Sequence, residues 1–234
     1  MLPVLLGCSP DAVRKVLVLG AHADDIEIGC GGTILRLVRE LGPLEVRWQV
    51  LSGEGGRAEE AAASAASFLG PDQAGEVVVS AFRDGFFPWE GAAIKEAFEE
   101  LKGSFEPDLI LAPRRDDAHQ DHRVVSELTW NTFRDHLIME YEIPKYEGDL
   151  GAPVLFVPLD EATAARKVEL LLSGFPSQLH RQWFRADTFW SVLRLRGVES
   201  NSPTGYAEGF HVRKVVLPSV TAVAVDHDAH ARPG

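Results

Sequence analysis

Cysteine, basic residues and long apolar runs are all scarce in this 234-residue chain. With 2 Cys it can form neither a disulfide framework nor a four-thiolate zinc site, and such a count is typical of a reducing compartment. Lys and Arg number 23 against 35 Asp and Glu, which gives a formal net charge of -12. This charge repels nucleic-acid phosphates, and no basic stripe offsets it. The sequence therefore predicts a cytoplasmic protein without a nucleic-acid partner.

The apolar runs are too short for a membrane protein. The opening MLPVLLGC has no basic residues before its apolar stretch, and that stretch cannot span a bilayer. Hydrophobic residues make up 45% of the chain and charged residues 25%, which excludes a disordered or fibrous protein. We expect no membrane partner, and a single domain over residues 1–217 followed by a poorly ordered tail over residues 218–234.

Short apolar strands alternate with helical patterns along the first half of the chain. β-branched and apolar runs predict strands over residues 15–20, 45–51, 76–79 and 109–112. Apolar residues spaced by three and four predict a helix over residues 31–41. An Ala-rich stretch stopped by Gly70-Pro71 predicts a helix over residues 57–69, and further helices are predicted over residues 92–101 and 123–138. Because this alternation produces a parallel, wound sheet, the predicted fold class is α/β: a three-layer Rossmann-like fold with a mostly parallel central sheet.

The second half of the chain continues this pattern less regularly. Residues 139–151 are polar and include Pro144 and Gly148, so we predict a loop that covers a site or sets specificity. An aromatic-rich segment over residues 177–197 is predicted to be helical and to line a pocket or an interface. The remaining predicted elements are a strand at 154–157, a helix at 161–172 and a closing strand at 206–216.

Two polar segments, 21–27 and 116–122, directly follow predicted buried strands. The first reads AHADDIE and the second reads DDAHQDH. Ligands bind at the carboxyl ends of strands in a wound sheet, and imidazole and carboxylate groups together suit zinc with a position left for water. Asp residues at a helix start also act as caps, which is an alternative for either segment alone. Capping does not require His, however, and both segments contain it.

The two motifs resemble those of the LmbE/PIG-L family of zinc-dependent N-deacetylases, which remove acetyl groups from N-acetylglucosamine-containing and related substrates. The resemblance covers roughly residues 15–212 and is carried by HADD-x-E followed by GCGGT, with D-x-H-x-DH downstream. Weaker supporting pieces are 51–54 with Arg57 and Glu60, the Asp84-Gly85 pair, Ser177-Gln178 and residues 206–210. The fold, the activity and a zinc cofactor, with Fe2+ or another divalent metal as an alternative, follow from this resemblance as expectations.

The resemblance also assigns roles to matching residues. The implied metal ligands are His22, Asp25 and His122. Asp24 matches the general base, and His119 matches the histidine that faces the developing oxyanion. Two further matches are Asp121, which would orient His119 and hold its charge, and Arg57, which would contact the substrate.

The chain departs from the family pattern at several positions. Ala23 replaces a proline, and Asp117 stands where some relatives have a tyrosine that acts as general acid. The proton donor is then His119, or Asp24 acting twice. Outside these positions, we expect Glu27 to satisfy nearby backbone donors and residues 29–32 to form a tight turn.

We therefore predict a metal-dependent hydrolase that removes an acyl group from the nitrogen of an N-acetylglucosamine-type or related small molecule. Two alternatives remain at this stage: a hydrolase of another amide or ester, such as a natural-product intermediate, and a catalytically idle protein that holds a metal. The predicted partner is a small-molecule substrate, with assembly into a homo-oligomer left open.

Overall fold

The central element is a seven-stranded sheet with the order β3-β2-β1-β4-β5-β7-β6. A computed structural model describes residues 13–71 and 74–216. The predicted tail over residues 218–234 lies outside them. The strands are β1 (Lys15–His22), β2 (Glu45–Ser52), β3 (Ala74–Val79), β4 (Leu109–Pro113), β5 (Leu137–Tyr141), β6 (Leu155–Leu159) and β7 (Tyr206–His211). Strands β1 to β5 pair in parallel and β7 pairs antiparallel with both β5 and β6, so the sheet is mostly parallel as predicted.

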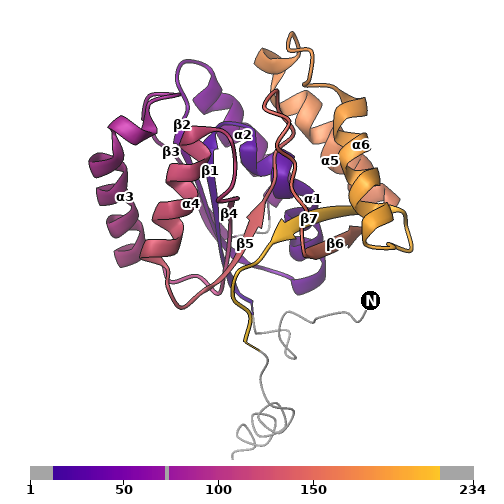
Figure 1. Cartoon of the computed structure of the whole chain (residues 1–234), viewed down its shortest axis with the longest axis horizontal. Coiled ribbons are helices and arrows are strands. Elements are labelled where there is room, and N and C mark those ends of the chain that lie inside the picture. Colours follow the sequence, from indigo (N-terminus) through magenta and orange to yellow (C-terminus); the bar gives the residue numbers. More distant parts are fainter. Residues whose placement is uncertain (1–12, 72–73, 217–234) are drawn as a thin grey trace, which may run out of the picture.

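Helices cover both faces of the sheet, so the fold has three layers (Figure 1). The helices are α1 (Asp25–Leu41), α2 (Arg57–Leu69), α3 (Gly91–Ser104), α4 (Gln120–Thr132), α5 (Glu161–Gly174) and α6 (Ala186–Glu199), with short 3-10 turns η1 (Phe87–Trp89) and η2 (Pro176–Gln178). Successive residues of β1 explain the layering, because Val16 and Val18 join the core under α1, α2 and α5, whereas Leu17 and Leu19 join the core under α3 and α4. Within the described part of the chain, no helix is long and apolar enough to cross a membrane.

The predicted helix over residues 123–138 is wrong in its second half. Helix α4 ends at Thr132, and Leu137–Tyr141 forms β5 in the interior of the sheet, so the predicted loop over 139–151 begins too early. The apolar residues of this strand follow the helix after a short gap, and periodicity alone does not separate a buried strand from a further helical turn.

Glycines 29, 31 and 32 lie inside α1 rather than in the predicted tight turn. A Cβ on Gly29 would lie 2.1 Å from the Tyr141 ring, and one on Gly32 would lie 2.4 Å from Leu159. The glycines therefore allow the helix to lie close to the sheet, so the GCGGT motif is a packing motif here.

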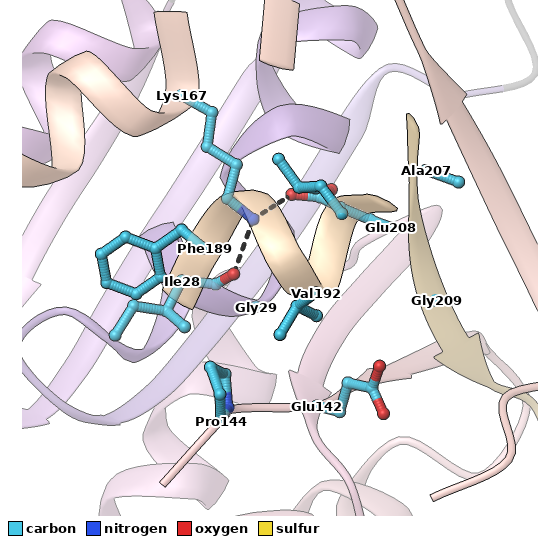
Figure 2. Close-up of a pocket in the computed structure, with 11 residues that line it drawn as sticks. Ile28, Gly29, Glu142, Pro144, Lys167, Phe189, Val192, Ala207, Glu208 and Gly209 are labelled. Atoms are coloured by element: carbon cyan, nitrogen blue, oxygen red, sulfur yellow. Dashed lines mark hydrogen bonds and ion pairs between the residues drawn. The ribbon is translucent and has the colours of Figure 1, made fainter. Parts of the chain in front are cut away.

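A buried ionic cluster fixes the middle of α1 to α5 and β7 (Figure 2). Glu208 accepts hydrogen bonds from the backbone N–H groups of Gly32 (2.8 Å) and Thr33 (2.6 Å), and from Lys167 Nζ (2.6 Å). Lys167 also donates to the carbonyl oxygen of Ile28 at 2.6 Å. We call Glu208, Lys167 and Thr33 the Glu208 cluster; it fixes the helix whose first turn carries the candidate site.

Candidate metal centre

The candidate site lies where β1 and β4 end, at the carboxyl edge of the parallel strands. Asp24 connects β1 to α1 with φ 108° and ψ -21°, a left-handed conformation that is unfavourable for residues other than glycine. Such a conformation costs about 1–3 kcal/mol and persists where the surrounding structure enforces it. The strained turn separates His22, at the end of the strand, from Asp25 in the first turn of the helix.

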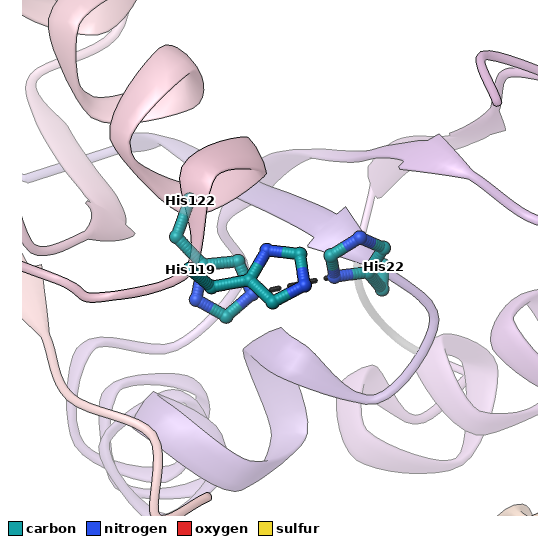
Figure 3. Close-up of side chains that lie close together, drawn as sticks. All are labelled: His22, His119 and His122. Carbon is teal, nitrogen blue, oxygen red and sulfur yellow. Dashed lines mark hydrogen bonds between the residues drawn. The ribbon is translucent and has the colours of Figure 1, made fainter. Parts of the chain in front are cut away.

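Three side-chain atoms from the two predicted motifs lie close together: His22 Nδ1, Asp25 Oδ2 and His122 Nε2. The distances between them are 3.5 Å from His22 to Asp25, 3.3 Å from His122 to Asp25, and 3.3 Å between the two imidazoles. Ligands bound tetrahedrally at the usual zinc distances lie roughly 3.3–3.5 Å apart. These atoms, here called the donor triangle, could therefore hold a divalent metal, and Figure 3 shows the two rings turned toward each other.

The second nitrogen of each imidazole faces a carboxylate. His22 Nε2 lies 3.1 Å from Asp121 Oδ2 and 3.0 Å from Asp84 Oδ1, and His122 Nδ1 lies 3.0 Å from Asp117 Oδ2. The contact at His122 is close but is not aligned as a hydrogen bond. Histidines that bind metals usually present one nitrogen to the metal and the other to such a group, so the surroundings fit the donor set.

The charges around the two imidazoles explain the directions of their pKa shifts. Burial alone would lower the pKa of His122, but the charges of Asp25 and Asp117 outweigh it and raise the pKa to about 9. The pKa of His22 is likewise raised by Asp121 and Asp25, against the effect of burial. The carboxylates thus give this buried site a strong preference for a cation, which a divalent metal would satisfy with both imidazoles neutral.

Asp121 does not bond to His119 as the resemblance implied. Its carboxylate accepts from the backbone N–H groups of Gly85 at 2.6 Å and Phe87 at 3.2 Å, in addition to its contact with His22. Only the backbone N–H of Asp121 meets His119, at Nδ1. Burial and the neighbouring imidazoles lower the pKa of His119, although the charge of Asp121 acts in the opposite direction.

His119 nevertheless lies beside the donor triangle. Its ring centroid is 4.9 Å from that of His22 and 4.8 Å from that of His122 (Figure 3). One nitrogen from each of these three histidines falls in a group whose atoms all lie within 4.8 Å of one another. A second group of this kind joins His22 and His119 to Asp84 and Asp121.

Asp24 and Arg57 form an ion pair at the edge of the site. Arg57 Nη2 lies 3.1 Å from Asp24 Oδ2 and also donates to the carbonyl oxygen of Ala23. Burial raises the pKa of Asp24 to about 7, although Arg57 lowers it. A carboxyl group with this pKa can both accept and release a proton near neutral pH. The structure thus places the Arg57 guanidinium in contact with Asp24, the candidate general base.

Two residues that the sequence motifs did not assign to roles also belong to the site. Asp84 reaches His22 from the loop before η1, and Lys145 reaches Asp117 from the loop between β5 and β6, with Nζ 2.9 Å from Oδ2. Asp84 belongs to the Asp84-Gly85 pair, which gave only weak support to the resemblance. Nothing in the sequence distinguished Lys145 from the other residues of the polar loop. Both contacts join residues that are far apart in the sequence, so they become visible only in the folded structure.

An open pocket of about 370 Å³ lies beside this loop. Lys145 forms part of its wall and also contacts Asp117, which in turn lies 3.0 Å from His122. The other lining residues are Pro144, Tyr146, Gln182, Trp183, Arg185, Asp187 and Thr188. Residues from the predicted pocket-lining segment are thus present in its wall.

A comparison with models of known protein families shows which family the chain belongs to. A family model described as PIG-L, GlcNAc-PI de-N-acetylase, matches residues 17–133, which is half of the chain and includes every residue of the donor triangle. The chain belongs to the PIG-L family. The predicted family is therefore confirmed, and the PIG-L description is that of a deacetylase.

Solved structures with the PIG-L fold extend the likeness over most of the chain. A conserved protein from Thermus thermophilus is 22% identical, with 88% of this chain and 97% of that chain covered and a TM-score of 0.65. N,N'-diacetylchitobiose deacetylase from Pyrococcus horikoshii is 18% identical, with 90% and 89% covered and a TM-score of 0.68. The 4-carboxy-2-hydroxymuconate hydratase of Pseudomonas putida is 16% identical, with 88% and 98% covered and a TM-score of 0.63. At these identities the likeness establishes the fold.

Proposed function

We propose that the chain is a divalent-metal-dependent N-deacetylase that releases acetate and a free amine from an N-acetylglucosamine-type or related small molecule. The observation that carries this proposal is the donor triangle, whose edges of 3.3–3.5 Å match those of a tetrahedral metal site. Family membership supports the reaction type. Zinc is the proposed metal because imidazole and carboxylate donors suit it, and Fe2+ is the alternative.

His22, Asp25 and His122 would hold the metal. When bound, a divalent cation supplies a Lewis acid that polarises the acyl carbonyl and activates water. Asp24, buried beside the donor triangle, accepts the proton of the attacking water and then returns it to the leaving nitrogen. Arg57 orients the Asp24 carboxylate through their contact at 3.1 Å.

His119 is the proposed donor to the oxygen that becomes negative during attack. Its ring lies beside His22 and His122, so a carbonyl oxygen bound at the triangle would be within its reach. Asp121 then acts on His22 instead of His119, by accepting at Nε2 while two backbone N–H groups fix its carboxylate. We therefore propose Asp121 as an orienting residue for a metal ligand.

The pocket of about 370 Å³ is the proposed binding place for the rest of the substrate. Tyr146 and Trp183 offer ring faces there, while Gln182 and Arg185 offer donors. We continue to predict a cytoplasmic location and leave assembly into a homo-oligomer as a prediction. A size-exclusion measurement of the purified protein tests the latter.

The proposed function is tested by loading purified protein with Zn2+ and measuring amine release from N-acetylglucosamine, N,N'-diacetylchitobiose and further N-acetylated compounds. We expect amine and acetate in equal amounts, a loss of activity with a chelator and recovery after Zn2+ is returned. His119→Ala should lower kcat about 100- to 1,000-fold while metal content stays constant.

Other outcomes identify the alternatives. Turnover of simple esters or other amides without turnover of any N-acetyl compound would favour a hydrolase of a different class. Tight metal binding without turnover of any compound would favour a protein that only holds the metal.

A further inference from the structure

The Lys145 side chain lies between two carboxylates from different loops. Its Nζ donates to Asp117 Oδ2 at 2.9 Å and lies 2.7 Å and 2.9 Å from the two carboxylate oxygens of Asp149. The Lys145 side chain is 10% exposed, and those of Asp117 and Asp149 are 1% and 15% exposed. Such a desolvated ammonium keeps a defined position, unlike a surface lysine.

Asp117 connects this ammonium to the donor triangle. The Oδ2 atom that accepts from Lys145 also lies 3.0 Å from His122 Nδ1, and Oδ1 accepts from the backbone N–H of His119 at 2.8 Å. One carboxylate oxygen therefore lies between Lys145 and the imidazole of a proposed metal ligand.

We propose that Lys145 is a positioning residue for the metal centre. It fixes the carboxylate of Asp117, and Asp117 in turn holds the ring of His122 with Nε2 toward Asp25 and His22. The inference rests on the metal site proposed above and extends it to a loop that carries none of the proposed ligands.

The surrounding charges indicate what removal of Lys145 would do. Asp149 keeps other partners, because Arg114 Nη2 lies 3.2 Å from its Oδ2 and the backbone N–H of Ala118 donates to it at 2.7 Å. Asp117 would lose its only ion-pair partner besides His122 among the described residues and would face Asp149 without a cation between them. We therefore expect Asp117 to move and His122 to lose its fixed orientation.

Direct charge repulsion between Lys145 and a bound metal would have the opposite effect on affinity, because removal of Lys145 would then strengthen metal binding. The charge of Lys145 is balanced by Asp117 and Asp149, and Asp117 with the His122 ring separates it from the donor triangle. We expect the positional effect to exceed this repulsion, so loss of Lys145 weakens metal binding.

The test measures the Kd for Zn2+ by competition with a chromophoric chelator, and therefore needs no substrate. Groups that orient metal ligands typically contribute 10- to 100-fold in affinity, so we expect about 10-fold weaker binding in Lys145→Met and about 10- to 100-fold in Asp117→Asn. Because Lys145 acts through Asp117, adding Lys145→Met to Asp117→Asn should cause no further loss. The Co2+ absorption spectrum should change in both single variants. Lys145→Arg should be intermediate.

The matched control is Lys95→Met, because Lys95 bonds to Glu99 and Asn131 on the far layer of helices. Its Zn2+ affinity should equal that of the wild type. A Lys145→Met protein with wild-type affinity or tighter binding, or additive losses in the double variant, would overturn the inference and leave the proposed function intact. A wild type that binds no Zn2+ would overturn both. If Lys145→Met does not fold, wild-type affinity and spectrum in Lys145→Arg would overturn the inference.

Discussion

Helix α1 carries two buried charged clusters that differ in how completely their polar atoms are paired. In the Glu208 cluster, the carboxylate accepts from two backbone N–H groups, a hydroxyl and an ammonium. In the donor triangle, two imidazole nitrogens and a carboxylate oxygen face one another at 3.3–3.5 Å, and only the carboxylate oxygen has a backbone donor, the N–H of His22. Burial is similar, but only the second arrangement is completed by an added cation.

This difference separates a structural cluster from a binding site more reliably than charge or burial does. Lys167 and Glu208 form a strong buried ion pair with Nζ and Oε1 2.6 Å apart, yet their hydrogen bonds all end within the fold. Buried pairs of this kind mainly fix one structure. The donor triangle instead brings together two imidazole nitrogens and a carboxylate oxygen, the atom types that bind zinc, within 3.3–3.5 Å of one another.

The largest expected effect is the loss of metal on changing Asp25. Asp25→Ala removes one corner of the triangle, so metal content should fall from about one ion per chain to a small fraction, with activity at background. Metal analysis of the dialysed protein measures this. The matched control is Glu208→Gln, which alters a buried carboxylate that bonds to the same helix. If Asp25→Ala kept a full complement of metal, the assignment of the triangle would be wrong.

Asp24 lies beside the donor triangle but is not one of its three residues, so a change at Asp24 should affect catalysis without affecting metal binding. Asp24→Asn keeps the size of the side chain and removes its basicity, so kcat should fall about 100- to 10,000-fold while metal content stays unchanged. Steady-state kinetics with parallel metal analysis separate the two effects. Retention of most activity would rule out Asp24 as the base.

Changes in the Glu208 cluster should lower the stability of the protein and leave metal binding intact. Lys167→Met leaves the buried Glu208 without its cation, which typically costs about 3–5 kcal/mol in the free energy of unfolding. Urea denaturation measures that loss. Folded Lys167→Met protein at low temperature should still bind Zn2+, and a loss of Zn2+ affinity without a loss of stability would contradict the distinction between the clusters.

The smallest effect concerns Glu27, a buried carboxyl between the two clusters. Its oxygens make no well-aligned hydrogen bond within the described ranges, although Ser64 and the backbone N–H of Glu27 itself lie close enough to lower its pKa. Burial raises its pKa from 4.5 to about 8. The folded state thus binds this proton more tightly than the unfolded state does, and the free energy of unfolding should fall as the pH rises between these values.

Glu27→Gln should remove that decline and raise the free energy of unfolding at pH 8 by about 1–3 kcal/mol. Urea unfolding curves of both proteins from pH 5 to pH 8 test this expectation. Parallel curves for the variant and the wild type would show that Glu27 keeps an ordinary pKa.

Much of the fold could be predicted from local patterns. The Ala-rich stretch before Gly70-Pro71 predicted α2 at its observed bounds, Arg57–Leu69, and apolar runs predicted four of the five parallel strands. The missed strand, β5, failed because Leu137–Tyr141 follows a helix of similar composition after a short break. Its place in the sheet depends on pairing with β4 and β7, which no local pattern contains.

The sequence likewise predicted some contacts of the candidate site and missed others. The motifs brought His22, Asp25 and His122 together as implied, because both segments follow strands of one sheet edge. The partner of Asp121 was missed, since its contacts with His22 and Gly85 join residues 99 and 36 positions apart. Lys145 could not be found either, because a single lysine in a polar loop resembles any surface lysine until Asp117 and Asp149 surround it.

The Glu208 cluster also determines when the protein can finish folding during synthesis. The bond between Gly32 and Glu208 joins positions 176 residues apart, and β7, the last strand of the described chain, lies between β5 and β6 rather than at an edge. A ribosome therefore releases every metal donor long before the strand that completes the sheet and fixes α1. Because contacts between distant positions form late, we expect the nascent chain to remain incompletely packed, with β5 and β6 not yet joined, until β7 emerges.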